Sequence, residues 1–108
     1  MADFVFSEKD NGALVQVPRG SKVTIELPEN PRTGHQWTID NVDEVFLVPE
    51  GDAFLTGAQM GLGAGGVRRL FFRAKGTGCT SLSLINKRAQ KSAKEETGTF
   101  KLAVRIVK

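Results

Sequence analysis

The sequence has few of the side chains that usually carry catalysis. Its 108 residues include one cysteine, one histidine and no tyrosine. A single cysteine cannot form an intrachain disulfide, and a nucleophilic Cys–His pair would have to join Cys79 to His35. Cys79 begins an alternating strand pattern, so we interpret it as a small buried hydrophobic residue. A zinc site would need several carboxylates beside these two ligands, so we expect no enzymatic activity, metal or cofactor.

Long apolar runs and a strong charge imbalance are also missing. No apolar stretch approaches the about 20 residues that span a bilayer, so we expect no membrane partner. The net charge of +3 is mild and does not by itself indicate nucleic-acid binding. A basic cluster is formed by Lys87, Arg88, Lys91 and Lys94. It contains no interleaved aromatic residue on which a base could stack, so we expect no nucleic-acid partner.

The length of the chain is that of one domain, which we expect to span residues 1–108. Its first residues, Met1 to Phe4, lack the basic-then-apolar order of a signal peptide. As written, the chain is therefore expected in the cytoplasm. If it is a processed form, we expect it in the periplasm, in the lysosome or outside the cell.

The strongest pattern is a two-residue alternation of apolar and polar side chains, which is typical of strands with one buried face. It is clear at Val23, Ile25 and Leu27, and again from Phe100 to Ile106. Further alternating segments lie at Val15–Val17, Leu70–Ala74 and Leu82–Leu84, with shorter candidates at Phe4–Phe6, His35–Ile39 and Val45–Val48. Glycine and proline separate these segments, for example at Pro49–Gly51. The pattern predicts an all-β sandwich or barrel of seven or eight short strands.

Three connections are unusual in length or composition, and long loops of this kind tend to be functional. They run from Pro28 to Gly34, from Gly57 to Gly66 and from Asn86 to Gly98. The prolines of the first segment restrict its backbone, which is consistent both with a preorganised recognition surface and with an ordinary proline-rich turn. We expect the three loops to be the second-to-third, fourth-to-fifth and sixth-to-seventh connections. They would then share one end of a sandwich.

The second loop contains the spacing G-x-G-x-x-G at Gly61, Gly63 and Gly66. A dinucleotide site requires a helix after this motif, whose N-terminus meets the pyrophosphate. Here Val67–Phe72 follows and is expected to be a strand, which argues against nucleotide binding. A hairpin loop, or a bare backbone that another protein can approach closely, is consistent with the glycines.

The motifs in these loops resemble those of the chagasin-like family of cysteine protease inhibitors. The family's N-P-x-T-G loop corresponds to Asn30, Pro31, Arg32, Thr33 and Gly34, with Trp37 at the expected distance. Its G-x-G-G loop corresponds to Leu62, Gly63, Ala64, Gly65 and Gly66. Where the family has R-P-W, this chain has Arg88, Ala89 and Gln90, so that only the arginine is kept. The resemblance implies an immunoglobulin-like β-sandwich of antiparallel strands with three binding loops at one end.

The resemblance also implies a mechanism, which is occlusion of the active-site cleft of a papain-like cysteine protease with a cathepsin-L-like catalytic domain. Thr33 would lie nearest the catalytic cysteine and histidine of the enzyme, and Gly34 would allow the turn. Gly65 and Gly66 would let the backbone pair with an extended enzyme segment, and Arg88 would contact the opposite wall. The inhibitor is expected to be a monomer. The alternative hypothesis is a non-inhibitory immunoglobulin-like module whose loops recognise another protein.

Overall fold

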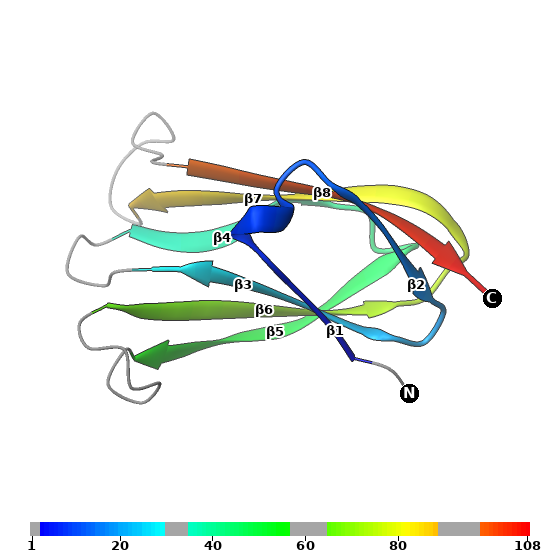
Figure 1. Ribbon diagram of the computed structural model, residues 1–108, viewed down its shortest axis with the longest axis horizontal. Coiled ribbons are helices and arrows are strands. Elements are labelled where there is room, and N and C mark those ends of the chain that lie inside the picture. The colour runs from blue at the N-terminus through cyan, green and yellow to red at the C-terminus, as the bar shows by residue number, and fades with distance from the viewer. Residues whose placement is uncertain (1–2, 30–34, 57–64, 89–97) are drawn as a thin grey trace.

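Two four-stranded sheets face each other in the computed structural model, which describes residues 3–29, 35–56, 65–88 and 98–108. The elements in chain order are β1 (Asp3–Ser7), the 3-10 helix η1 (Glu8–Asp10), β2 (Leu14–Pro18), β3 (Lys22–Pro28), β4 (His35–Val42), β5 (Leu47–Thr56), β6 (Gly66–Ala74), β7 (Gly78–Arg88) and β8 (Gly98–Val107). One sheet has the order β1-β3-β6-β5 and the other β2-β8-β7-β4 (Figure 1). The predicted all-β, immunoglobulin-like sandwich is confirmed. Among the described residues, no helix is long and apolar enough to cross a membrane.

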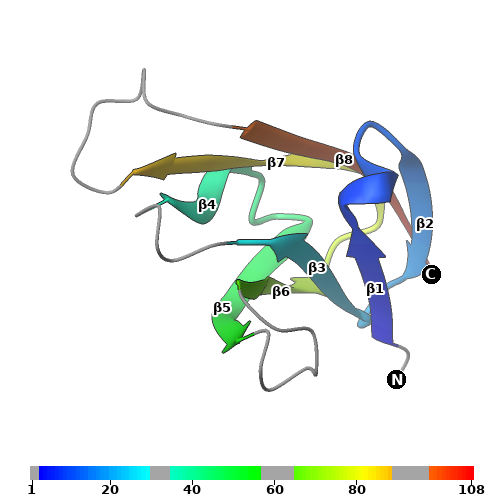
Figure 2. The ribbon, with the colours of Figure 1, turned by 60° about the vertical axis from the view of Figure 1, so that its left-hand side comes forward.

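The core lies between the two sheets and is built by the alternation seen in the sequence. Val23, Ile25 and Leu27 of β3 are buried, and they face Phe100, Leu102, Val104 and Ile106 of β8 across the sandwich. Leu70, Phe72 and Ala74 complete the β6 face, while Leu82 and Leu84 complete the β7 face. Burying a side chain of this size contributes about 1.5–3 kcal/mol. Inward positions of every central strand therefore hold the two layers together. Figure 2 shows the ribbon of the two sheets from a second direction.

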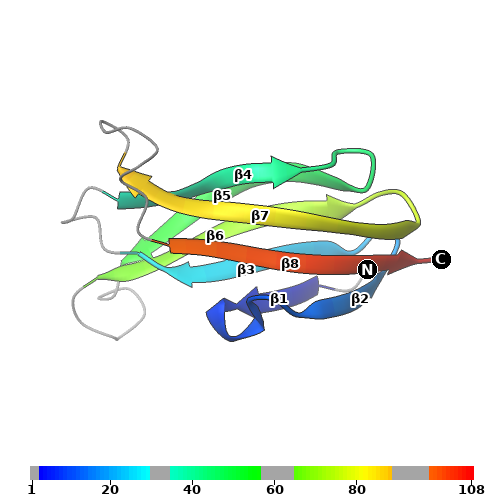
Figure 3. The same cartoon turned by 90° about the horizontal axis from the view of Figure 1, so that it is seen from above.

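The expectation of purely antiparallel strands is wrong for the first two. β1 pairs with β3 in parallel, and β2 pairs with β8 in parallel. The chain crosses from one sheet to the other through η1, so β1 and β2 occupy the same edge of the sandwich in different sheets (Figure 3). Alternation reports which face of a strand is buried but carries no information on the direction of its neighbour.

The segment Pro49–Gly51 is not the turn that its composition indicated. It lies inside β5, where the register against β6 shifts between Pro49 and Asp52. Gly51 has φ +106, a conformation that suits glycine. β5 is an edge strand, and there a proline without an N–H and a bulge are both tolerated. Leu47 begins the strand, whereas Val45 lies in the preceding turn.

Candidate functional site

The loop-bearing end of the sandwich is defined by six strand ends. β3, β5 and β7 end there, and β4, β6 and β8 begin there, at the left of Figure 1. Register places Thr56 opposite Gly66 in one sheet, and His35 opposite Arg88 and Asn86 opposite Gly98 in the other. The three undescribed intervals, 30–34, 57–64 and 89–97, are bordered by these ends. The strand ends that carry the three expected loops therefore meet at one end of the molecule.

The ordinal positions expected for these connections are wrong by one strand. Because β1 and β2 are separate strands, the connections are β3–β4, β5–β6 and β7–β8. Trp37 accordingly lies in the fourth strand and not in the third. The third connection is also shorter than expected, since Asn86, Lys87 and Arg88 belong to β7. Because these residues are polar, the apolar alternation does not reveal that the strand continues by pairing with β4.

Most of the residues expected to bind a protease lie outside the described residues. These are Asn30, Pro31, Arg32, Thr33, Gly34, Leu62, Gly63, Ala64, Ala89 and Gln90. Gly65 immediately precedes β6, Gly66 is its first residue, and Arg88 is the last residue of β7. The assignment of the whole set to a protease-binding surface stays a prediction.

Gly66 is required by packing inside the domain. A β-carbon at this position would touch the carbonyl oxygen of Leu55 and lie 2.6 Å from the ring of Phe54. The carbonyl oxygen of Gly66 also accepts the backbone N–H of Glu29 at 3.0 Å. Gly66 thus joins the end of β3 to the start of β6. Gly65 differs, because its φ of +84 requires glycine although the space around it is open.

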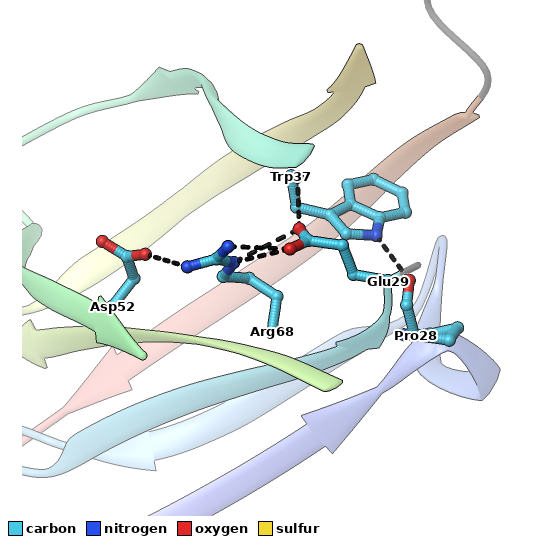
Figure 4. Close-up of polar contacts among 5 residues, drawn as sticks. All are labelled: Pro28, Glu29, Trp37, Asp52 and Arg68. Carbon is cyan, nitrogen blue, oxygen red and sulfur yellow. Dashed lines mark hydrogen bonds and ion pairs between the residues drawn. The ribbon is translucent and has the colours of Figure 1, made fainter. Parts of the chain in front are cut away.

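Glu29 is the last described residue before the first loop, and its carboxylate is buried. The side chain is 3% exposed. Its Oε1 accepts the backbone N–H of Trp37 at 2.8 Å, which connects β3 to β4 in the opposite sheet (Figure 4). A buried carboxylate is costly unless it is paired and hydrogen-bonded. Arg68 supplies the charge, so Glu29 is satisfied from both sheets.

Arg68 of β6 presents its guanidinium between two carboxylates. Its Nη2 donates to Glu29 Oε2 at 2.7 Å, and its Nε lies 3.2 Å from each Glu29 oxygen. Its Nη1 donates to Asp52 Oδ2 of β5 at 2.7 Å (Figure 4). Hydrogen bonding to Glu29 raises the pKa of Arg68 more than its partial burial lowers it. Arg68 therefore keeps its positive charge at every pH below the ordinary arginine range, and the stability that its protonation contributes is lost as the pH rises above that range.

Trp37 lies in the core and also contacts residues that border two of the loops. The residue is 8% exposed. Its indole N–H donates to the carbonyl oxygen of Pro28 at 2.9 Å, and a β-carbon at Gly98 would lie 3.6 Å from its ring. Trp37 therefore contacts the base of the first loop and the base of the third. We call Pro28, Glu29, Trp37, Asp52 and Arg68 the Glu29 network.

Sequence reasoning did not select Glu29, Asp52 or Arg68, although a signal for two of them was present. Glu29 continues the inward series of Val23, Ile25 and Leu27, and Arg68 continues that of Leu70, Phe72 and Ala74. Opposite charges on the buried faces of two alternating strands predict a buried pair. Asp52 gave no such signal, because the β5 bulge changes its register.

The candidate Cys–His pair is not brought together. Cys79 is exposed near the start of β7, so the expectation of a buried cysteine is wrong. Its register partner is Arg105, so its side chain points away from the core on an outer face. His35 lies opposite Arg88, nine residues further along β7, or about 30 Å at strand spacing. Within the described segments, no group of three or more His, Cys, Asp or Glu residues could hold a metal ion.

Comparisons with known proteins agree with this architecture. The family model "Chagasin family peptidase inhibitor I42" matches residues 16–104. Chagasin from Trypanosoma cruzi is 32% identical over 83 residues, which cover 72% of this chain and 74% of that protein. The crystal structure of the cysteine protease inhibitor EhICP2 from Entamoeba histolytica superposes with a TM-score of 0.83, at 21% identity over 98% of this chain and 96% of that one.

A structure of PbICP-C in complex with falcipain-2 has a TM-score of 0.57 and 12% identity, with coverage of 96% of this chain and 88% of that one. At these identities the two structures establish the shared fold, whereas the family model and chagasin establish descent. The family is one of inhibitors and not of enzymes. The chain belongs to the chagasin family of peptidase inhibitors, and the expected function, inhibition of cysteine proteases, is confirmed at the level of the family.

Proposed function

We propose that the protein is a reversible, monomeric inhibitor of papain-like cysteine proteases, with a preference for cathepsin-L-like catalytic domains. The observation that carries this proposal is the convergence of six strand ends at one end of the sandwich. The intervals between them contain the N-P-x-T-G and G-x-G-G motifs. Membership of the chagasin family supports the same target class.

Inhibition in this proposal is occlusion of the catalytic cleft. Thr33 approaches the catalytic cysteine and histidine of the enzyme, while Gly65 and Arg88 lie at the bases of the flanking loops. The enzyme thiolate needs no covalent partner in the inhibitor, so no cofactor takes part. A preorganised binding surface keeps more of its contact energy as affinity, because less conformational freedom is lost on association.

The test is an inhibition panel with papain and several cathepsin-L-like enzymes. Wild-type protein is expected to inhibit reversibly, and the double variant Thr33→Ala/Gly34→Ala to inhibit at least about tenfold more weakly, as expected for a central contact. Val45→Ala is the control, since Val45 is 68% exposed in the turn before β5, away from the loop-bearing end. Absence of inhibition at micromolar concentrations across the panel contradicts the proposal. Capture of a non-protease partner under those conditions would support the interaction-module alternative.

A further inference from the structure

The Glu29 network contacts the bases of all three loops, although no residue in it belongs to the loop motifs. Glu29 directly precedes the first loop, and its backbone N–H reaches Gly66 at the base of the second. Trp37 follows the first loop and lies against Gly98 at the base of the third. Arg68 joins β6 to β5 through Asp52, on the two strands that border the second loop. These contacts therefore connect the strand ends that border all three loops.

The linkage depends on the shape of a guanidinium group. Arg68 binds Glu29 through Nε and Nη2, and it binds Asp52 through Nη1. A lysine ammonium is a compact point charge and cannot reproduce this fork. The guanidinium fixes both the separation and the relative orientation of Glu29 and Asp52.

A buried ion pair of this kind is a poor source of stability. The desolvation of the two charges offsets most of their attraction, and apolar replacements of similar volume are often equally stable. An apolar pair would not, however, fix the separation and orientation of Glu29 and Asp52 as the guanidinium does. In an inhibitor that must present three separate loops to one cleft, such a constraint reduces the reorganisation needed on binding.

We propose that Arg68 and Glu29 are positioning residues, which set the relative placement of the three loops and thereby the affinity for the protease. The inference rests on the proposed function. It predicts that disturbing the network weakens inhibition even when the protein remains fully folded. A residue that only stabilises the fold would change the apparent affinity only by the fraction of molecules that unfold.

The experiment compares two charge-preserving variants in the same strand, Arg68→Lys and Arg73→Lys. Arg73 also pairs with a glutamate, Glu50, and donates to the carbonyl oxygen of Gly20, at the opposite end of β6. Inhibition constants against papain are measured at a temperature where circular dichroism shows each variant to be folded. Arg68→Lys is expected to raise the inhibition constant about tenfold, the scale of one or two lost ordering contacts. Arg73→Lys is expected to leave it within about twofold.

A second variant, Glu29→Gln/Arg68→Met, removes the buried charges and keeps an acceptor for the Trp37 N–H. It is expected to remain folded and to inhibit as weakly as Arg68→Lys. The indole N–H resonance of Trp37 gives an independent readout, because this is the only tryptophan in the sequence. Both Arg68 variants are expected to shift that resonance, whereas Arg73→Lys is expected to leave it in place.

The outcomes separate the two proposals. If the wild type inhibits no papain-like enzyme, the proposed function fails and the positioning role fails with it. If the wild type inhibits and the folded Arg68 variants inhibit equally well, the positioning role is overturned and the proposed function stands. A weaker inhibition by Arg68→Lys that matches its unfolded fraction would likewise overturn it.

Discussion

Gly66 and Gly98 occupy equivalent places, since each is the first residue of a strand at the loop-bearing end. Their surroundings differ. A β-carbon at Gly66 collides with the Leu55 carbonyl and the Phe54 ring, whereas one at Gly98 makes an ordinary contact with Trp37 at 3.6 Å. The first glycine is therefore required by packing and the second is not. This difference could not be predicted from the sequence, because the neighbours of the two glycines come from distant parts of the chain.

Gly66→Ala is expected to lower the free energy of unfolding by about 1–3 kcal/mol, the usual cost of overpacking. Gly98→Ala is expected to change it by less than about 0.5 kcal/mol. Urea unfolding of both variants measures the difference. Equal stabilities would contradict the assignment of Gly66 to internal packing.

Cys79 gives a second prediction at this scale, because its side chain is exposed and not buried. The folded protein is expected to react with a thiol reagent such as 5,5′-dithiobis(2-nitrobenzoate) to completion, one thiol per chain. Cys79→Ser is expected to leave the free energy of unfolding within about 0.5 kcal/mol. Reaction only after denaturation would show that the cysteine is protected.

At the level of single strands, β6 shows how burial changes the value of an ion pair. Arg68 and Arg69 are neighbours on opposite faces of this strand. Arg68 pairs with a carboxylate that is 3% exposed, whereas Arg69 pairs with Glu26 on the outer face, where both side chains are partly exposed. Removing one partner of a buried pair leaves an uncompensated charge, while solvent screens an exposed pair.

Arg68→Ala is therefore expected to destabilise the protein by about 3–5 kcal/mol, and Arg69→Ala by less than about 1 kcal/mol. Chemical denaturation at neutral pH measures both values. Hydrogen bonding to Glu29 raises the pKa of Arg68, so Arg68 stays charged at neutral and acidic pH. Titration of Arg68 is therefore not expected to change the difference in stability between the two variants in this range. Similar losses for the two variants would contradict the account of the Glu29 network.

The elements also show where sequence reasoning succeeds. Alternation located the buried faces of β3, β6, β7 and β8, because each buried face is a local property of its strand. The β5 bulge and the parallel pairings of β1 and β2 depend on neighbours that the local pattern does not report. The continuation of β7 through Arg88 was missed because its last residues are polar.

At the scale of the whole molecule, the family motifs predicted loops at one end of the sandwich, and the strand ends that border these motifs do converge there. The Glu29 network was not foreseen, since it joins residues as far apart as Glu29 and Arg68, which come together only in the folded chain. Within it, only Glu29 and Arg68 follow from inward parity once charge is considered, whereas Asp52 does not.

A monomer of 11.7 kDa is expected in free solution, because the loops are proposed to face a protease and not a second copy. With an excess of catalytically inactive protease, the complex should gain one inhibitor mass per enzyme. Light scattering after size exclusion measures both species. A dimer that persists at micromolar concentration, or a different stoichiometry, would contradict a single inhibitor seated in one cleft.

The central claim, that the loop-bearing end occludes the catalytic cleft, is tested most directly by alkylation of the protease cysteine. Papain is incubated with an active-site epoxide probe, with and without an equimolar amount of the inhibitor. The account predicts that the inhibitor abolishes labelling and is recovered uncleaved after denaturation of the complex. Unchanged labelling under conditions where substrate hydrolysis is blocked would place the inhibitor elsewhere on the enzyme and contradict occlusion.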